Sequence, residues 1–145
     1  MNAKDLIARF VVNPVHRTVF SLSGGRVANK GFGMPVVELT TTGRKSGKRR
    51  TTMLTSPVQD GDTWVLVASY GGDDRNPQWF LNLRDNPDVE FKTGAEPRPM
   101  RARVATQDEK AHLWPRVIAA HQGYANYQTK TDRDIPLVIL TPRSS

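Results

Sequence analysis

The chain has 145 residues, a length typical of one domain with its own buried core. It contains no cysteine, which excludes disulfides, thiolate zinc sites, iron–sulfur clusters and a cysteine nucleophile, so any redox chemistry must come from a bound cofactor. The formal net charge is +7, from 21 Lys and Arg against 14 Asp and Glu, and this surplus favours an anionic partner such as nucleic acid, anionic lipid or a phosphorylated ligand.

Residues 1–33 predict a short helix followed by a glycine-rich loop, ahead of a barrel that spans residues 36–145 of the same single domain. The apolar positions with helical spacing are Leu6, Ile7, Phe10 and Val11, and Pro14 ends the run. The run is too short to cross a bilayer and does not resemble a signal peptide, so we expect a cytoplasmic protein. The helix either docks on the domain or makes a peripheral contact with a membrane.

Two β-hairpins are predicted next. Branched residues over 36–42 and a second strand over 49–56 flank the glycine-bounded turn Gly43-Arg44-Lys45-Ser46-Gly47. Asp60-Gly61 is a strong turn signal before a mostly apolar strand over 63–69. Three consecutive antiparallel strands fit a meander or barrel better than a parallel βαβ unit.

The second half of the chain predicts two further helices among strands. Asn76 and Pro77 suit the N-cap and first residue of a helix, and strands follow over 89–92 and 100–105. Thr106 and Glu109 have the spacing of a capping box, and Pro115 should kink or restart the helix that follows. A closing strand over 136–141 is apolar enough to be buried on both faces.

Five cations lie within residues 44–50, at the tip of the first predicted hairpin. Hydroxyls, backbone amides beside glycine, and cations are all ligands for phosphate, although the spacing of a Walker A loop is absent. A solvated basic turn and a nucleic-acid site are the alternatives. The second requires aromatic side chains for stacking on bases, whereas Trp64 and Trp114 occupy core-like positions, so we do not expect nucleic-acid binding.

Other candidate residues point away from hydrolysis. The three histidines are scattered, without the spacing of a metal site or a catalytic triad, and we expect no metal. Tyr124 and Tyr127 lie three residues apart in a polar stretch and would share one face of a helical turn. On a loop with few apolar neighbours, they are expected to do more than fill a core. Tyr70, beside two glycines, is either a packing residue at the barrel rim or a ligand contact.

From residue 36 onward, the order of motifs resembles the family of deazaflavin-dependent nitroreductases and quinone reductases, whose members use coenzyme F420. The matching segments are Leu39-Thr40-Thr41-Thr42-Gly43-Arg44-Lys45-Ser46-Gly47, Arg50, Ala68-Ser69, Asn76-Pro77-x-Trp79-Phe80-Leu81-Asn82-Leu83, Asn86-Pro87, Trp114-Pro115, Tyr124-x-x-Tyr127 and Thr131-Asp132-Arg133-x-Ile135-Pro136. The resemblance implies a mainly β fold with helices, an antiparallel split β-barrel like that of flavin reductases, with a coenzyme groove along its side.

The resemblance also implies residue roles. Positions expected to bind the coenzyme's phosphate and acidic tail are Arg44, Lys45, Ser46 and Arg50. Positions expected to line its ring and ribityl portion are Thr51, Thr52, Met53, Leu54, Val67, Ala68, Ser69, Tyr70, Gln78, Trp79, Phe80, Leu81 and Asn82. Tyr124 and Tyr127 are the catalytic candidates on the acceptor side, with Ser69 near the ring.

The implied function is transfer of a hydride from reduced coenzyme F420 to a small organic acceptor: a quinone, an enone or a nitroaromatic. Thr55 and Ser56 stand where nitroimidazole-reducing members carry an aromatic pair, and His121 where such members can carry another tyrosine. This departure makes quinones and other conjugated acceptors as plausible as nitro compounds. The alternatives are a non-catalytic carrier of a deazaflavin or other anion, and a split-barrel reductase that binds flavin mononucleotide. The protein itself is expected to be a monomer or a homodimer.

Overall fold

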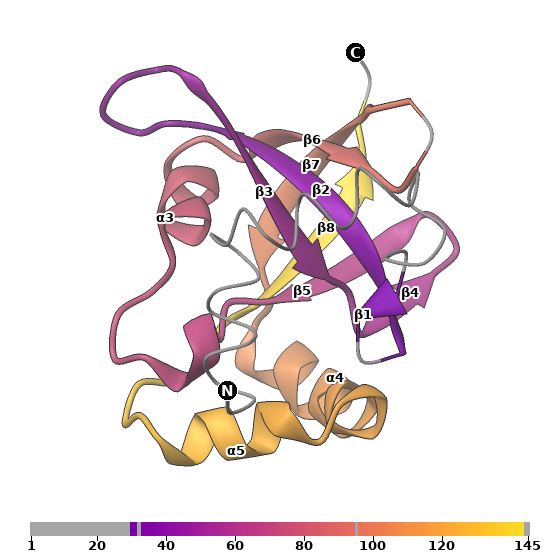
Figure 1. Cartoon of the computed structure of the whole chain (residues 1–145), viewed down its shortest axis with the longest axis vertical. Coiled ribbons are helices and arrows are strands. Elements are labelled where there is room, and N and C mark those ends of the chain that lie inside the picture. The colour runs from indigo at the N-terminus through magenta and orange to yellow at the C-terminus, as the bar shows by residue number, and fades with distance from the viewer. Residues whose placement is uncertain (1–29, 32, 95, 144–145) are drawn as a thin grey trace.

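Eight strands form one curled antiparallel sheet in the computed structural model, which describes residues 30–31, 33–94 and 96–143 (Figure 1). The strands are β1 (Lys30–Gly31), β2 (Met34–Thr42), β3 (Arg49–Thr55), β4 (Val58–Asp60), β5 (Thr63–Val67), β6 (Asp88–Lys92), β7 (Arg98–Val104) and β8 (Leu137–Pro142). Their order is β1-β2-β6-β7-β8-β5-β4, with β3 paired to β2 off this path. The predicted N-terminal helix lies outside the described residues.

Strand β2 pairs with β3 along its length, from Val36 opposite Thr55 to Thr42 opposite Arg49. It pairs with β6 over a shorter stretch, from Glu38 opposite Lys92 to Thr40 opposite Glu90. Both hairpins predicted from the sequence are present: β2 pairs with β3, and β4 pairs with β5 across the turn that begins at Asp60. The curled sheet with helices around it is the predicted split barrel.

Strands β5 and β8 form a wall between two hydrophobic cores. Trp64 and Leu66 of β5 face the core inside the curled sheet, whereas Val65 and Val67 face a second core against the helices at one end. Strand β8 alternates in the same way, as period-two side-chain geometry requires. The closing strand is therefore buried on both faces, as predicted.

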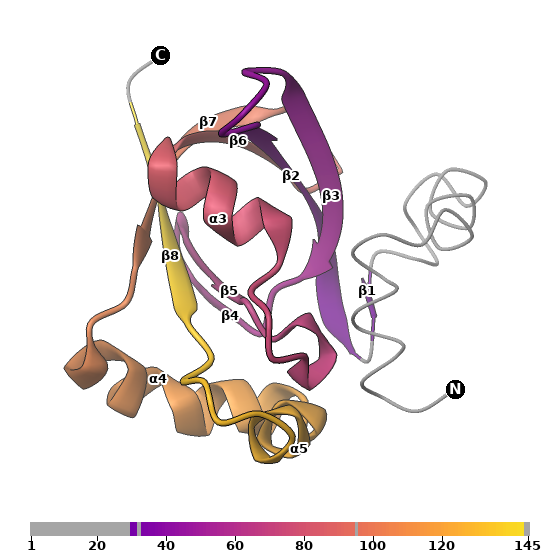
Figure 2. The same cartoon turned by 90° about the vertical axis from the view of Figure 1, so that its left-hand side faces the viewer.

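Helix α3 (Gln78–Asp85) lies across the open side of the curled sheet (Figure 2). Trp79, Phe80 and Leu83 pack into the inner core, as their spacing predicts. The predicted cap is wrong by one residue: Pro77 is the N-cap, and the side-chain oxygen of Asn76 instead accepts a hydrogen bond from Arg133 at 3.0 Å.

Helices α4 (Gln107–Ala120) and α5 (Gly123–Thr129) cover one end of the barrel (Figure 2). The capping box of Thr106 and Glu109 is present, as predicted. Helix α4 continues through Pro115, so it does not restart there, whereas a kink at this residue stays a prediction. Ala111 and Pro115 are both exposed, so the carbonyl that loses its helical donor can face water. In the part of the chain that the structure describes, every helix is too short or too polar to span a bilayer.

Candidate functional site

The turn between β2 and β3 is a closed loop fixed by backbone hydrogen bonds. The Gly43 amide donates to the Lys48 carbonyl at 2.7 Å, and the Gly47 amide donates to the Gly43 carbonyl at 2.8 Å. Gly47 has φ +73°, a conformation that favours glycine. The Ser46 hydroxyl accepts from the Lys48 amide at 3.1 Å. The cationic tip is thus held in one conformation by its own backbone.

Asn82 of α3 forms hydrogen bonds with this turn and with the strand before it. This residue is 5% exposed, and its Oδ1 accepts from both the backbone amide (3.2 Å) and Nη1 (2.9 Å) of Arg44. Its Nδ2 donates to Thr41 Oγ1 at 3.3 Å. The amide of Asn82 is therefore engaged in positioning Arg44, a contact that its predicted role at the coenzyme did not anticipate.

A cavity of about 680 Å³ opens between the hairpin and α3. Within the part of the chain that the structure describes, it is lined by Thr41, Gly43, Arg44, Lys45, Ser46, Arg49, Arg50, Thr51, Thr52, Gln78, Trp79 and Asn82. Nine of these were predicted from the sequence to bind the coenzyme. Thr41, Gly43 and Arg49 were not, although all three lie in or beside the predicted cationic turn.

The cavity is electropositive, because four of the described residues that line it are cations and none of them is a carboxylate. Arg49 is engaged, with Nη2 2.9 Å from Glu90 Oε1 and Nη1 near the Thr42 hydroxyl. Lys45 and Arg50 have no acidic partner among the described residues. The groove therefore suits an anionic ligand with several charges or hydrogen-bond acceptors.

Several predicted coenzyme contacts lie in the cores instead of the cavity. Met53 packs with Val36, whereas Leu54 and Phe80 belong to the inner core and Leu81 packs against it. Val67 faces the second core and Ala68 the inner one. Burial of an apolar side chain stabilises the folded state, which explains why these side chains lie on the inward faces of their strands and helix. Contact of these residues with a coenzyme stays a prediction.

Two buried hydrogen-bonding atoms have no partner within the described residues: Ser69 Oγ and Trp79 Nε1. Ser69 is fully buried two residues after the end of β5, and Trp79, 3% exposed, lines the cavity. A buried donor without a partner costs free energy, so such atoms in a native protein call for an explanation such as a ligand. Both were predicted to line the ring and ribityl portion of the coenzyme, and their chemistry fits a polar ligand.

Tyr124 and Tyr127 lie in α5 and not in a loop, and both are buried in the second core. Their rings meet edge to face, with centroids 5.9 Å apart. The Tyr124 hydroxyl and Thr55 Oγ1 are hydrogen-bonded at 3.2 Å. The polar residues around the tyrosines lie on the outer face of α5, which is why the sequence suggested a loop.

Burial raises the pKa of Tyr124 to about 12 and raises that of Tyr127 as well, so both phenols keep their protons at neutral pH. His121 lies beside them, with ring centroids 5.3 Å from Tyr124 and 6.3 Å from Tyr127, and burial lowers its pKa. The structure does not bring this aromatic cluster to the lining of the cationic cavity. Among the described residues, no cluster of His, Asp or Glu could hold a metal ion.

The sheet is a curled antiparallel half-barrel, and a cationic groove lies beside its β2–β3 hairpin. These two features place the chain in the class of split-barrel proteins, with a groove suited to an anionic small molecule. A model of the F420H(2)-dependent quinone reductase family matches residues 13–142. The chain belongs to this family, which confirms the resemblance and agrees with the predicted deazaflavin-dependent reductase.

Individual relatives agree with this assignment. The chain is 41% identical over 133 residues to the F420H(2)-dependent quinone reductase Rv1261c of Mycobacterium tuberculosis, and the match covers 89% of each protein. A solved F420-H2 dependent reductase, FDR-A, matches with TM-score 0.66 and 42% identity over 73% of this chain and 93% of its own. A second solved structure, described as a domain-swapped dimer, matches with TM-score 0.68 and 36% identity over 89% of this chain and 98% of its own.

Proposed function

We propose that this protein is a reductase that takes a hydride from reduced coenzyme F420 and delivers it to a quinone. The observation that carries the proposal is the cationic groove between the β2–β3 hairpin and α3, in a chain that belongs to the F420H(2)-dependent quinone reductase family. The coenzyme carries a phosphodiester and several glutamates. A groove whose described lining includes four cations and no carboxylate suits such a polyanion.

The tail of the coenzyme would be held by Arg44, Lys45, Ser46 and Arg50. Arginine can bind phosphate or carboxylate through two parallel hydrogen bonds, and lysine adds a mobile positive charge. The Arg44 side chain is already oriented before the coenzyme binds, because Asn82 accepts hydrogen bonds from both its backbone amide and its guanidinium. Lys45 and Arg50 supply charge that no described acidic group neutralises.

The ring of the coenzyme would lie toward Trp79 and Ser69, whose unpartnered donors are suited to its polar edge. When bound, the deazaflavin supplies hydride chemistry as an obligate two-electron donor. The protein then has to orient the acceptor and stabilise the negative charge that develops on its oxygen.

Reduction of a quinone to a hydroquinone by a hydride also consumes one proton. Tyr124 and Tyr127 are the proposed proton donors or hydrogen-bond donors to the reduced oxygen, because both phenols stay protonated at neutral pH. Their burial means that the acceptor would have to reach them through the second core. Quinones are preferred over nitro compounds here because of the family name and because Thr55 and Ser56 provide no aromatic pair.

The test is a titration of coenzyme F420 fluorescence, followed by a screen of quinones, enones and nitroaromatics with the reduced coenzyme. We expect binding at micromolar or lower concentration and steady oxidation by at least one quinone. Lys45→Gln should weaken binding by about tenfold, a loss of about 1.4 kcal/mol. Lys48→Gln is the matched control, because Lys48 has the same charge in the same turn but does not line the cavity.

The same assays separate the alternatives. Binding of the coenzyme without turnover of any acceptor would indicate a carrier, and tighter binding of flavin mononucleotide would indicate a flavin enzyme. No binding of either coenzyme would contradict the proposal. A homodimer is proposed on the ground that one solved relative is described as a domain-swapped dimer. The cytoplasmic location and a peripheral membrane contact stay predictions.

A further inference from the structure

The turn that follows β5 has an uncommon backbone. Tyr70, Gly71 and Gly72 have φ values of +46°, +65° and +84°, so three consecutive residues are left-handed. Glycine adopts this conformation freely, whereas a tyrosine rarely does. Within the turn, the Gly72 amide donates to the Ser69 carbonyl at 2.9 Å and the Asp73 amide donates to the Tyr70 carbonyl at 3.1 Å. A strained turn of this kind persists only where its surroundings support it.

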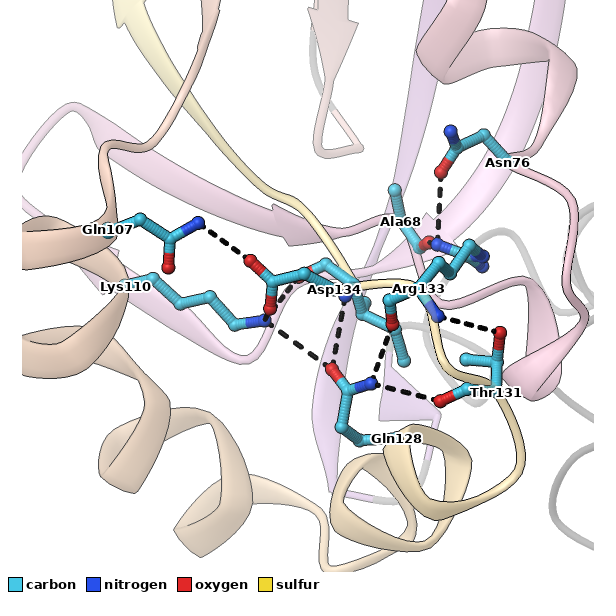
Figure 3. A network of polar contacts seen from close by, with 9 residues as sticks. Ala68, Asn76, Gln107, Lys110, Gln128, Thr131, Arg133 and Asp134 are labelled. Carbon is cyan, nitrogen blue, oxygen red and sulfur yellow. Dashed lines mark hydrogen bonds and ion pairs between the residues drawn. The ribbon is translucent and has the colours of Figure 1, made fainter.

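The support comes from the guanidinium of Arg133, more than sixty residues further along the chain. It donates to the carbonyls of Ala68 (3.1 Å) and Ser69 (2.8 Å), which precede the turn, and to the carbonyl of Asp73 (2.8 Å), which follows it. It also donates to Asn76 Oδ1 at 3.0 Å (Figure 3). One planar group therefore holds both ends of the left-handed turn.

Arg133 is itself held by Gln128 of α5 and by Thr131, which follows this helix. Its amide donates to Thr131 Oγ1 at 3.3 Å, and its carbonyl accepts from Gln128 Nε2 at 2.8 Å (Figure 3). Gln128 Oε1 also accepts from the Ile135 amide at 3.1 Å. The turn packs closely on the same helix, since a Cβ at Gly72 would lie 2.7 Å from the Tyr127 carbonyl oxygen.

We propose that Arg133 is a positioning residue, which fixes the left-handed turn and thereby sets the place of the buried Ser69 hydroxyl at the coenzyme ring. This inference rests on the proposed function. The inference adds to that function a role for the Thr131-Asp132-Arg133 motif, although Arg133 does not line the cavity. A lysine cannot take its place, because a single ammonium group cannot reach acceptors on both sides of the turn in one plane.

The first test uses the ligand-free protein and measures amide hydrogen exchange. In Arg133→Lys and Arg133→Ala, the Gly72 and Asp73 amides should exchange at least about tenfold faster relative to the amides of β5 and β8, since local opening has its own free energy. Arg75→Lys is the matched control, because Arg75 lies in the same segment but is exposed and binds the Asp73 carboxylate. Unchanged relative exchange at Gly72 and Asp73 would show that Arg133 does not hold the turn.

The second test measures hydride transfer. Single-turnover oxidation of bound, reduced coenzyme F420 by a quinone should slow at least about tenfold in Arg133→Ala, because a small misplacement of a reacting group has effects of this size. Affinity for the coenzyme should change little, because the groove cations remain. Low millimolar guanidinium should restore part of the rate, and sodium chloride at the same ionic strength should not.

The outcomes are distinct. A folded Arg133→Ala protein with an unchanged rate of hydride transfer would overturn the positioning role. A slower rate that is explained by a lower folded fraction, and that guanidinium does not restore, would overturn it too. Absence of coenzyme binding by the wild-type protein would instead overturn the proposed function, and the exchange result would still decide whether Arg133 holds the turn.

Discussion

The hydroxyl of Tyr124 is a polar atom inside a core, and Thr55 is its hydrogen-bond partner at 3.2 Å. Thr55→Val keeps the shape of the side chain but leaves the buried phenol, among the residues that the structure describes, with only the sulfur of Met34, 3.8 Å away. We expect a loss of about 1–2 kcal/mol in the free energy of unfolding. Urea denaturation checks this value.

A double-mutant cycle with Tyr124→Phe is the control for that prediction. When both hydroxyls are absent, no buried donor is left unpaired, so the double variant should lose less stability than the sum of the single changes. Additive effects would mean that the hydrogen bond contributes nothing.

The imidazole of His121 makes stability depend on pH. Burial lowers its pKa, so the unfolded chain binds a proton that the folded protein does not hold. The stabilisation is complete above the unfolded pKa of about 6.5 and is lost as the pH falls through the lower folded value. We expect the Tm to fall on acidification from pH about 7.5 to about 5, and His121→Gln to flatten this dependence.

His112→Gln is the matched control, because His112 is exposed on α4. The window stays above the range in which carboxylates titrate, including Glu109, whose pKa the Arg103 guanidinium lowers to about 2. Equal slopes in wild type and His121→Gln would contradict the assignment.

Helix α4 begins at a capping box in which Thr106 Oγ1 accepts from the Glu109 amide at 3.1 Å and Glu109 Oε1 accepts from the Thr106 amide at 2.9 Å. Thr106→Ala removes half of this arrangement and should lower the free energy of unfolding by about 1 kcal/mol. Gln122→Ala at the N-cap of α5 should have almost no effect, because Gln122 makes no side-chain cap bond. Urea midpoints at equal m-values decide between the two outcomes.

At the scale of elements, the sequence was most informative where local chemistry decides the structure. The two hairpins and the capping box of α4 follow from glycine turns, β-branched runs and a three-residue spacing. The errors arose where distant residues intervene. Asn76 is not a cap because Arg133 takes its oxygen, and Tyr124 is buried because the wall of β5 and β8 supplies an apolar partner for α5.

The candidate site follows the same rule. The cations and hydroxyls of the cavity lie in one hairpin, so the sequence located them together. The role of Asn82 in holding Arg44 and that of Arg133 in holding the turn after β5 depend on contacts between residues 38 to 65 positions apart. No local pattern reports such contacts, because they exist only once the barrel has closed.

For the molecule as a whole, the net charge of +7 adds a long-range attraction to the local contacts of the groove. Affinity for coenzyme F420 should fall as ionic strength rises, since salt screens exposed charges beyond about 10 Å at 0.1 M. Arg50→Gln should weaken both the affinity and its dependence on salt. Fluorescence titrations at several salt concentrations measure both.

Arg101→Gln is the control for charge alone. It lowers the net charge by the same amount, but Arg101 lies on β7, pairs with Asp88 and does not line the cavity. Its effect on affinity should be small. If Arg101→Gln lowered the affinity as much as Arg50→Gln, the coenzyme would be attracted by the net charge and not by the groove in particular.

The two-faced wall of β5 and β8 has a consequence for how the protein melts. Because each of these strands contributes alternate side chains to both cores, neither core can come apart while the other stays intact. Heating should therefore produce one cooperative transition with equal calorimetric and van't Hoff enthalpies, and no half-melted species that keeps one end of the barrel.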